Sequence, residues 1–150
     1  MQELPRINYF INHVLSADEA LMDIVQGRIH MQVAPQAATE EERAAISPFV
    51  LATYQGGIDT QPLGRMRVMT RALYQIAVCY IGAPDEAVYT ASDRVDELMG
   101  NVGPYPLTIA SEPWVFDGRR EQPLNLTQFD SGIYYERLGG LYRINAYKGA

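Results

Sequence analysis

The chain has 150 residues, of which 47% are hydrophobic and 20% charged, and this balance is typical of one soluble globular domain rather than of a disordered or fibrous chain. The formal charge of −6 and the pI near 4.8 exclude a protein that grips nucleic acid, because phosphate binding needs clustered basic side chains and the 12 Lys and Arg residues are scattered. The single cysteine, Cys79, excludes an internal disulfide and has apolar neighbours, as expected of a small core residue. The N-terminus lacks the features of a signal peptide and no apolar run reaches the roughly 18 residues of a membrane span, so we expect a soluble, unexported protein.

Two helices are predicted at the N-terminus. The first covers residues 5–15, where apolar residues recur at helical spacing. Its buried stripe is Ile7, Phe10, Ile11, Val14 and Leu15. Ser16 and Glu19 have the spacing of a capping box, which predicts that a second short helix begins there and ends at Gly27.

A short strand and a long connection follow. The strand Arg28–Val33 alternates apolar and polar residues, which predicts one wet face. For the connection Ala34–Ser47 two interpretations stay open. Thr39 and Glu42 have the spacing that caps a helical turn, whereas the run of three glutamates is typical of a solvated loop, and we favour the loop.

The centre of the chain is predicted to form a long hairpin. A strand covers Phe49–Gln55, a polar loop covers Gly56–Arg65, and a second strand covers Met66–Ile81. At about 3.3 Å per residue the second strand would span roughly 50 Å, so its Arg-rich start should project beyond the body. A projecting arm favours an assembly protein over a small-molecule enzyme.

The C-terminal half completes an α+β fold. A helix is predicted at about 84–99, with acidic residues in its first turn and Gly100 at its end. Residues 101–112 are predicted to be a loop because they hold a glycine and two prolines. The remaining strands are expected at 113–117, 124–129, 133–138 and 141–147, with turns at Asp117-Gly118, Asp130-Ser131-Gly132 and Gly139-Gly140. The predicted fold class is therefore α+β, with a mostly antiparallel sheet and a long central hairpin, flanked by an N-terminal helix pair and one helix.

The motifs of common enzymes are absent from the sequence. No dinucleotide fingerprint, phosphate loop, nucleophile elbow or paired-histidine zinc helix occurs. His13 and His30 are too few for a metal site, and Asp117 and Asp130 fall in turn sequences where such side chains bond their own backbone. We therefore expect no catalytic residues, no metal and no cofactor.

Tyrosine is unusually frequent, with ten residues against four phenylalanines. The last two predicted strands hold Tyr134, Tyr135, Tyr142 and Tyr147. Such side chains suit either an interface or cross-strand aromatic pairs on a half-exposed sheet, and both interpretations stay open.

With these elements in order, the chain resembles the bacteriophage tail terminator, or tail completion, family. The resemblance covers nearly the whole chain. It depends on Ser16-Ala-Asp-Glu-Ala-Leu, Gly27-Arg-Ile, Ala34-Pro, Pro48-Phe-Val-Leu, Arg67-Val-Met-Thr-Arg, Asp93-Arg-Val-Asp-Glu-Leu and Tyr135-Glu-Arg-Leu-Gly-Gly-Leu-Tyr-Arg-Ile. The connection Ala34–Ser47, with its three glutamates, is a departure from the family pattern.

The resemblance implies a single domain, residues 1–150, that assembles in the host cytoplasm into a ring, commonly a hexamer, at the head–tail junction of the virion. Such a ring caps the tail tube and receives the head connector, so the implied partners are other copies, the tail tube protein and the connector or neck protein. Genomic DNA would pass through without specific binding, and no membrane is involved. Alternatives are a neck or head-completion protein and a small α+β enzyme or ligand-binding domain.

The predicted interface lies on the projecting arm and in the tyrosine-rich strands, because a cyclic ring needs two different patches on each subunit. Its residues are Asp59, Gln61, Leu63, Arg65, Arg67, Arg71, Tyr134, Tyr135, Tyr142 and Arg143.

Overall fold

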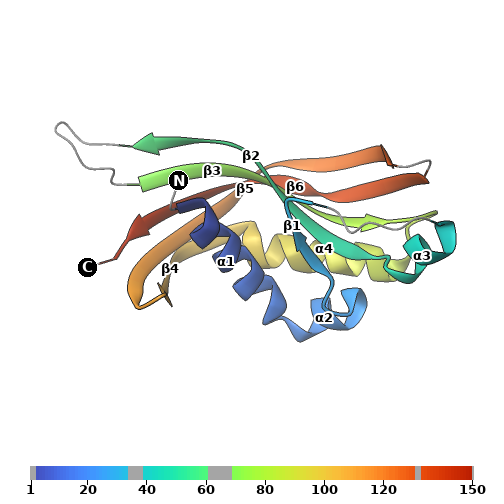
Figure 1. Cartoon of the computed structure of the whole chain (residues 1–150), viewed down its shortest axis with the longest axis horizontal. Helices are drawn as coiled ribbons and strands as arrows, with labels where there is room; N and C mark the ends of the chain where they lie inside the picture. The colour runs from blue at the N-terminus through green and yellow to red at the C-terminus, as the bar shows by residue number, and fades with distance from the viewer. Residues whose placement is uncertain (1–2, 34–38, 61–68, 131–132, 150) are drawn as a thin grey trace.

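One six-stranded sheet organises the protein, and helices cover one of its faces (Figure 1). The computed structural model describes residues 3–33, 39–60, 69–130 and 133–149. The strand order is β1-β2-β3-β6-β5-β4, and every neighbouring pair except β1–β2 is antiparallel. The predicted α+β class with its mostly antiparallel sheet is confirmed. In chain order the elements are α1 (Glu3–Ser16), α2 (Glu19–Val25), β1 (Ile29–Met31), α3 (Glu40–Ala45), β2 (Phe49–Thr60), β3 (Met69–Tyr80), α4 (Glu86–Met99), β4 (Asn101–Ile109), β5 (Glu112–Asp130) and β6 (Ile133–Lys148).

The hydrophobic core lies between the sheet and helices α1, α2 and α4. Alternate residues of β3 and β6 point into it, and Tyr74 and Tyr142 are the largest of its fully buried side chains. The buried stripe of α4 is Val88, Ala91, Val95 and Met99, which recur at helical spacing, and Leu98 packs beside it partly buried. Burial of Val88, Val95 and Met99 stabilises the fold by about 1.5 to 3 kcal/mol for each side chain. This layer fixes which face of the sheet stays open.

Short-range caps set the helix boundaries. Asp18, not Ser16, is the N-cap of α2, because its carboxylate accepts the Leu21 N–H at 3.0 Å. The Ser16 hydroxyl instead donates to the His13 carbonyl in the last turn of α1, so the predicted capping box is wrong. A helix also replaces the favoured loop between β1 and β2. Thr39 accepts the Glu42 N–H at 3.1 Å and begins α3.

The central hairpin is longer on its first strand than predicted. Strand β2 continues through the expected loop to Thr60, because a bulge between Tyr54 and Gly56 resets the register. The pairing then runs on to Thr60 opposite Met69. The hairpin tip, 61–68, lies outside the described residues.

The predicted loop at 101–112 is mostly strand β4. The sheet accepts its prolines because β4 is an outermost strand with one side unpaired, where a missing N–H costs nothing. A turn through Ala110 and Ser111, both with positive φ, then leads into β5. The proline pattern therefore marks an edge rather than a loop.

Strands β5 and β6 run without the turns predicted at Asp117-Gly118 and Gly139-Gly140. Gly139 pairs with Ala77 on one side and Leu124 on the other, in the middle of the sheet. A Cβ at Gly139 would lie 2.1 Å from the Ile76 carbonyl oxygen. Glycine is therefore required there for close approach of two strands, and not for a turn.

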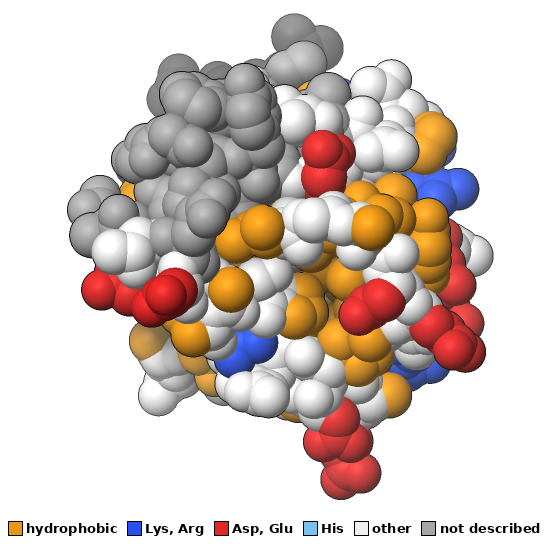
Figure 2. Space-filling view, turned by 90° about the vertical axis from the view of Figure 1, so that its right-hand side faces the viewer, with side chains coloured by type: hydrophobic (Ala, Val, Ile, Leu, Met, Phe, Trp, Pro, Cys, Tyr) orange, Lys and Arg blue, Asp and Glu red, His pale blue; other side chains and the backbone are white. Residues whose placement is uncertain are grey.

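Charge is divided between the two layers. Helices α1 to α4 with the caps Asp18 and Asp85 hold 12 acidic and 3 basic residues, a net −9, whereas the rest of the chain holds 9 basic and 6 acidic, a net +3. Acidic side chains accordingly stand around the hydrophobic patches on the end of the molecule seen in Figure 2. The protein is acidic on its helical face and slightly basic elsewhere.

Candidate subunit interface

Two strand segments extend past their neighbours and leave one edge of each unpaired. Strand β1 pairs with β2 only as far as Ala52, so Thr53–Thr60, here called the β2 overhang, has β3 on one side and no described strand on the other. Strand β4 pairs with β5 only as far as Arg119. The segment Gln122–Asp130, here called the β5 overhang, therefore pairs with β6 alone among the described strands. The two overhangs lie at opposite ends of the sheet (Figure 1).

A glutamine marks the point at which the β2 overhang begins. The Gln32 N–H donates to the Ala52 carbonyl at 2.7 Å, and the Gln32 side-chain oxygen accepts the Tyr54 N–H at 3.0 Å. Gln32 adopts a positive φ of 71°, which turns the chain away from the sheet. Its amide also reaches Asn8 of α1, which accepts the buried Tyr74 hydroxyl at 2.6 Å. Helix α1 thus stabilises the end of the β1–β2 ladder.

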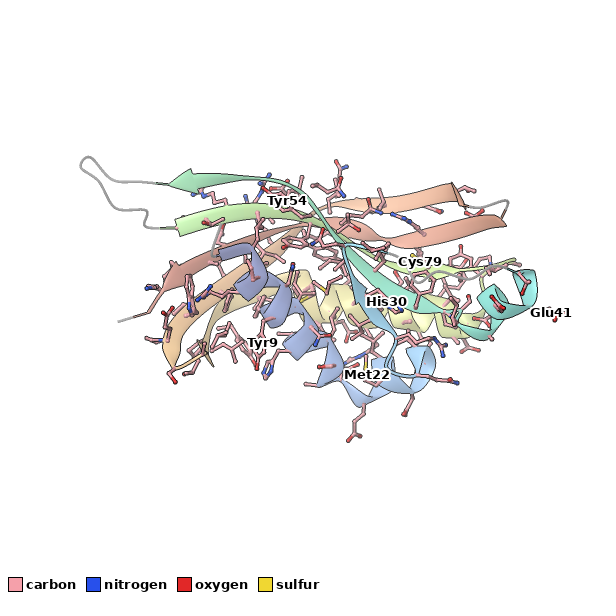
Figure 3. All side chains as sticks on the ribbon, viewed as in Figure 1. Tyr9, Met22, His30, Glu41, Tyr54 and Cys79 are labelled. Carbon is pink, nitrogen blue, oxygen red and sulfur yellow. The ribbon has the colours of Figure 1, made fainter. Side chains whose placement is uncertain are left out.

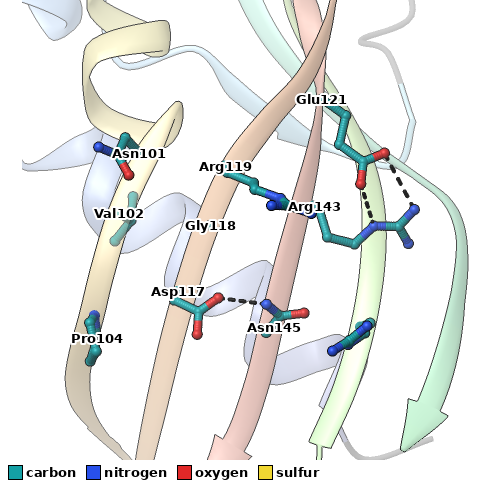
Figure 4. Close-up of a pocket in the computed structure, with 10 residues that line it drawn as sticks. Asn101, Val102, Pro104, Asp117, Gly118, Arg119, Glu121, Arg143 and Asn145 are labelled. Carbon is teal, nitrogen blue, oxygen red and sulfur yellow. Dashed lines mark hydrogen bonds and ion pairs between the residues drawn. The ribbon is translucent and has the colours of Figure 1, made fainter.

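The open face of the sheet carries a groove with three arginines, here called the arginine groove (Figure 4). Its volume is about 510 Å³, and it is lined by residues of four neighbouring strands, β3, β6, β5 and β4. Arg119 and Arg143 stand directly opposite each other on β5 and β6, and Arg71 reaches the groove from β3. Like charges in directly opposed positions destabilise a sheet unless an anion compensates them.

Carboxylates in the groove compensate part of this charge. Arg143 donates to Glu121 at 2.9 Å, and this bond holds the Glu121 pKa below its ordinary value. Asn145 donates to Asp117 at 2.6 Å, so Asp117 lies within strand β5 and not in the predicted turn. Arg71 and Arg119 make no ion pair with any described residue. The groove can therefore accept an anionic group, but its carboxylates are engaged and none is poised as a general base.

Arg71 and Arg143 of the predicted interface lie together in this groove. Asp59 lies on the β2 overhang, and Tyr134 and Tyr135 pair with Phe129 and Gln128 of the β5 overhang, although their side chains are not among those described. Gln61, Leu63, Arg65 and Arg67 lie outside the described residues.

Tyr142 is a core residue, so its prediction as an interface residue is wrong. Its side chain is 1% exposed and its hydroxyl donates to Asp96 of α4 at 3.2 Å. Burial, with the Asp96 charge, raises the pKa of this phenol. The residue parity of β6 explains the difference, because Tyr142 shares the helix-covered face with Ile144 while Arg143 points to the open face.

The sequence interpretation missed Arg119 and Glu121. Both fall within the segment that was divided by an expected turn at Asp117-Gly118. Their period-2 spacing with Asp117 is the signal that places all three on one face of a continuous strand.

The two histidines contact aromatic rings, and the cysteine is buried among apolar side chains. Burial raises the pKa of the Cys79 thiol to about 12, which suits a small core residue (Figure 3). His13 stacks on Tyr9, and His30 meets the edge of Phe49. Among the described residues no group of three His, Cys, Asp or Glu side chains could hold a metal ion. No helix in the described part of the chain is long and apolar enough to cross a membrane.

Comparison with known proteins gives an informative similarity among solved structures. No protein-family model matches the sequence, and no curated protein matches it either. Among solved structures, the chain is similar to one from the virion of a native gene transfer agent (GTA) particle, with a TM-score of 0.54 and 13% sequence identity. The match covers 93% of this chain and 92% of that chain. At this identity the likeness shows a shared fold from end to end.

Proposed function

We propose that this protein is a structural subunit of a phage-like virion, with no catalytic role. The observation that carries the proposal is the end-to-end match with a chain of the gene transfer agent virion, which covers 93% of this chain and 92% of that chain. The arginine groove supports the same conclusion, because its carboxylates are engaged in hydrogen bonds and ion pairs rather than directed at a reacting group.

Within such a particle, the position we propose is the end of the tail tube. A ring of this subunit, commonly of six copies in the family that the sequence resembles, would stop tube growth and receive the head connector. Its partners would be other copies, the tail tube protein and the connector. Support comes from the two overhangs, which are different surfaces at opposite ends of one subunit, as a head-to-tail ring requires.

The charge division bears on how genomic DNA would pass such a ring. Six copies would carry a formal charge of −36, six times −6. If the helices lined the channel, DNA would face their net charge of −54, six times −9, and would be repelled. The arginine groove lies on the open face of the sheet. If that face lined the channel, the arginines would make weak, salt-sensitive contacts with DNA phosphates.

Particles that lack this protein provide the test. We expect electron micrographs of such particles to show overlong tails, because nothing stops the tube. Tails of normal length that have lost their heads would instead identify a neck or head-completion protein. A protein that stays monomeric in solution and on purified tail tubes, and that binds a metabolite in the arginine groove, would refute the structural role.

A further inference from the structure

The outermost strands of the sheet are protected against edge pairing, whereas the two overhangs are not. Strand β1 offers only three residues, and β4 carries Pro104 and Pro106. Short edges and prolines are the usual means of preventing association through a sheet edge. The β2 overhang contains no proline, and the β5 overhang contains none after Pro123.

Hydrogen bonds within the chain identify which backbone groups of the β2 overhang face outward. In an antiparallel ladder the N–H groups of alternate residues point to opposite neighbours. The Val50 N–H donates to the Arg28 carbonyl and the Tyr54 N–H to Gln32, so both point away from β3. After the bulge at Tyr54 and Gly56 the phase shifts by one residue. Gly57 and Asp59 therefore point their N–H groups outward at the edge, where no described strand pairs with them.

The same alternation identifies the outward-facing backbone groups of the β5 overhang. The Arg120 N–H donates to the Gly100 carbonyl, so it points away from β6. The register shift between Arg120 and Gln122 moves the outward phase to Pro123, Asn125, Thr127 and Phe129. The Thr127 hydroxyl donates to Glu136 directly opposite on β6, so its side chain is engaged within the subunit while its N–H points outward.

Strand directions allow the two overhangs to meet. Across the sheet, β2, β3, β6 and β5 alternate in direction, so β5 runs opposite to β2. A second copy in the same orientation, placed beside the first and displaced along the strand direction until its β2 overhang reaches the β5 overhang, would set its β2 antiparallel to the first copy's β5. The overhangs have similar lengths, Thr53–Thr60 and Gln122–Asp130. The neighbour's β2 would occupy the part of the β5 edge that β4 leaves free.

We propose that the β2 overhang of one copy pairs antiparallel with the β5 overhang of the next, so that the sheets of neighbouring copies become continuous. This contact rests on the proposed function, because it is the means by which the proposed ring would close. It is heterologous, since each copy uses a different edge toward each neighbour. All copies then keep their helices on one side and their arginine grooves on the other.

Proline substitutions at outward positions test the pairing without touching the internal ladders. Asp59→Pro removes one outward N–H from the β2 overhang, and Thr127→Pro removes one from the β5 overhang. The matched controls, Asp59→Ala and Thr127→Ala, lose the same side chains and keep the N–H. The readouts are the native mass, measured alone and on purified tail tubes, and the thermal melt by circular dichroism. We expect both proline variants to lose assembly and both alanine variants to keep it.

A mixture of the two proline variants gives a sharper result. Asp59→Pro retains an intact β5 overhang, and Thr127→Pro retains an intact β2 overhang. An equimolar mixture should therefore give a dimer of one copy of each that extends no further, whereas each variant alone stays monomeric. Should Thr127→Pro lose its cooperative melt, Asn125 takes the proline instead. Gly57 cannot replace Asp59, because a Cβ there would lie 2.8 Å from the Arg71 carbonyl oxygen. Should Asp59→Pro unfold, the β5 variants mixed with wild type decide the test, since they should cap wild-type chains and prevent ring closure.

The outcomes separate this inference from the proposed function. A wild-type ring that both proline variants still form overturns the strand pairing and leaves the virion role standing. Failure of the mixture to give a dimer, when each variant is folded and monomeric, also overturns the pairing. A wild type that forms no assembly in solution or on tail tubes overturns both.

Discussion

Substituting Gly139 by alanine should strongly destabilise the protein, although the change adds one methyl group. The new Cβ would lie 2.1 Å from the Ile76 carbonyl oxygen and 2.6 Å from the Ala77 Cα. Both contacts are with backbone atoms of β3, so no side-chain rotation can relieve them. Strands β3 and β6 must move apart at their centre, where the ladder is continuous on both sides.

The expected cost follows from this geometry. Added methyl groups in well-packed regions typically cost 1 to 3 kcal/mol, and a clash with backbone on a central strand belongs at the upper end, about 3 kcal/mol. For a chain of 150 residues, each kcal/mol shifts the melting temperature by about 2 to 4 °C. We therefore expect Gly139→Ala to melt about 6 to 12 °C below the wild type.

Urea denaturation and thermal melts at a fixed protein concentration measure this difference, because assembly would make the melting temperature depend on concentration. Gly103→Ala is the matched control. A Cβ at Gly103 meets no atom within 4 Å, and the residue is exposed, so its melt should match the wild type. If Gly139→Ala melts within about 2 °C of this control, less than 1 kcal/mol separates them and the close-approach argument is refuted.

Three further predictions concern the core, the α2 cap and the thiol. Val95→Asp should cost more than about 3 kcal/mol in the free energy of unfolding because the 1% exposed valine becomes an unpaired buried charge, whereas Val33→Asp, at a 67% exposed position, should melt like the wild type. Asp18→Asn keeps a good N-cap but loses the ion pair with Arg94, so it should cost about 0.5 to 1 kcal/mol at pH 7. Because Arg94 lowers the Asp18 pKa, this stabilisation is complete above the ordinary pKa of 3.8 and is lost as pH falls through the lowered value; urea titrations at pH 7 and pH 3 should differ accordingly, and an equal cost at both would contradict the assignment. The Cys79 thiol, buried and with a pKa near 12, should react with a disulfide reagent at pH 8 only after denaturant is added, and rapid native labelling would show that the site opens.

Much of the fold could be predicted from the sequence because its signals are local. The stripe of α4, with Val95 at its centre, follows from side-chain spacing alone, and so does the alternation along β3. The errors arose where the same residue types serve a purpose set by distant parts of the chain. Gly139 permits contact with β3, and Pro104 protects an edge, but glycine and proline in isolation indicate turns.

The candidate interface was only partly predictable for the same reason. Arg71 and Arg143 were identified from composition and spacing, but their position in one groove depends on the order of β3, β6 and β5, which no local pattern contains. Tyr142 shows the reverse case. Its residue type favours an interface, and only the parity of β6 relative to the helices shows that it is buried.

The side chain of Gln32 would affect the register in which a strand from a second copy pairs with β2. Its amide closes the β1–β2 ladder at Tyr54, so an incoming strand can start only beyond that residue. A slip by one residue would turn every side chain of a strand to the wrong face. Gln32 also donates to Asn8 of α1 at 3.4 Å, which ties this position to the first helix. In the proposed pairing, the Gln32 amide therefore fixes the residue at which the neighbouring strand begins, and Gln32→Asn would loosen the register between subunits while each subunit still folds.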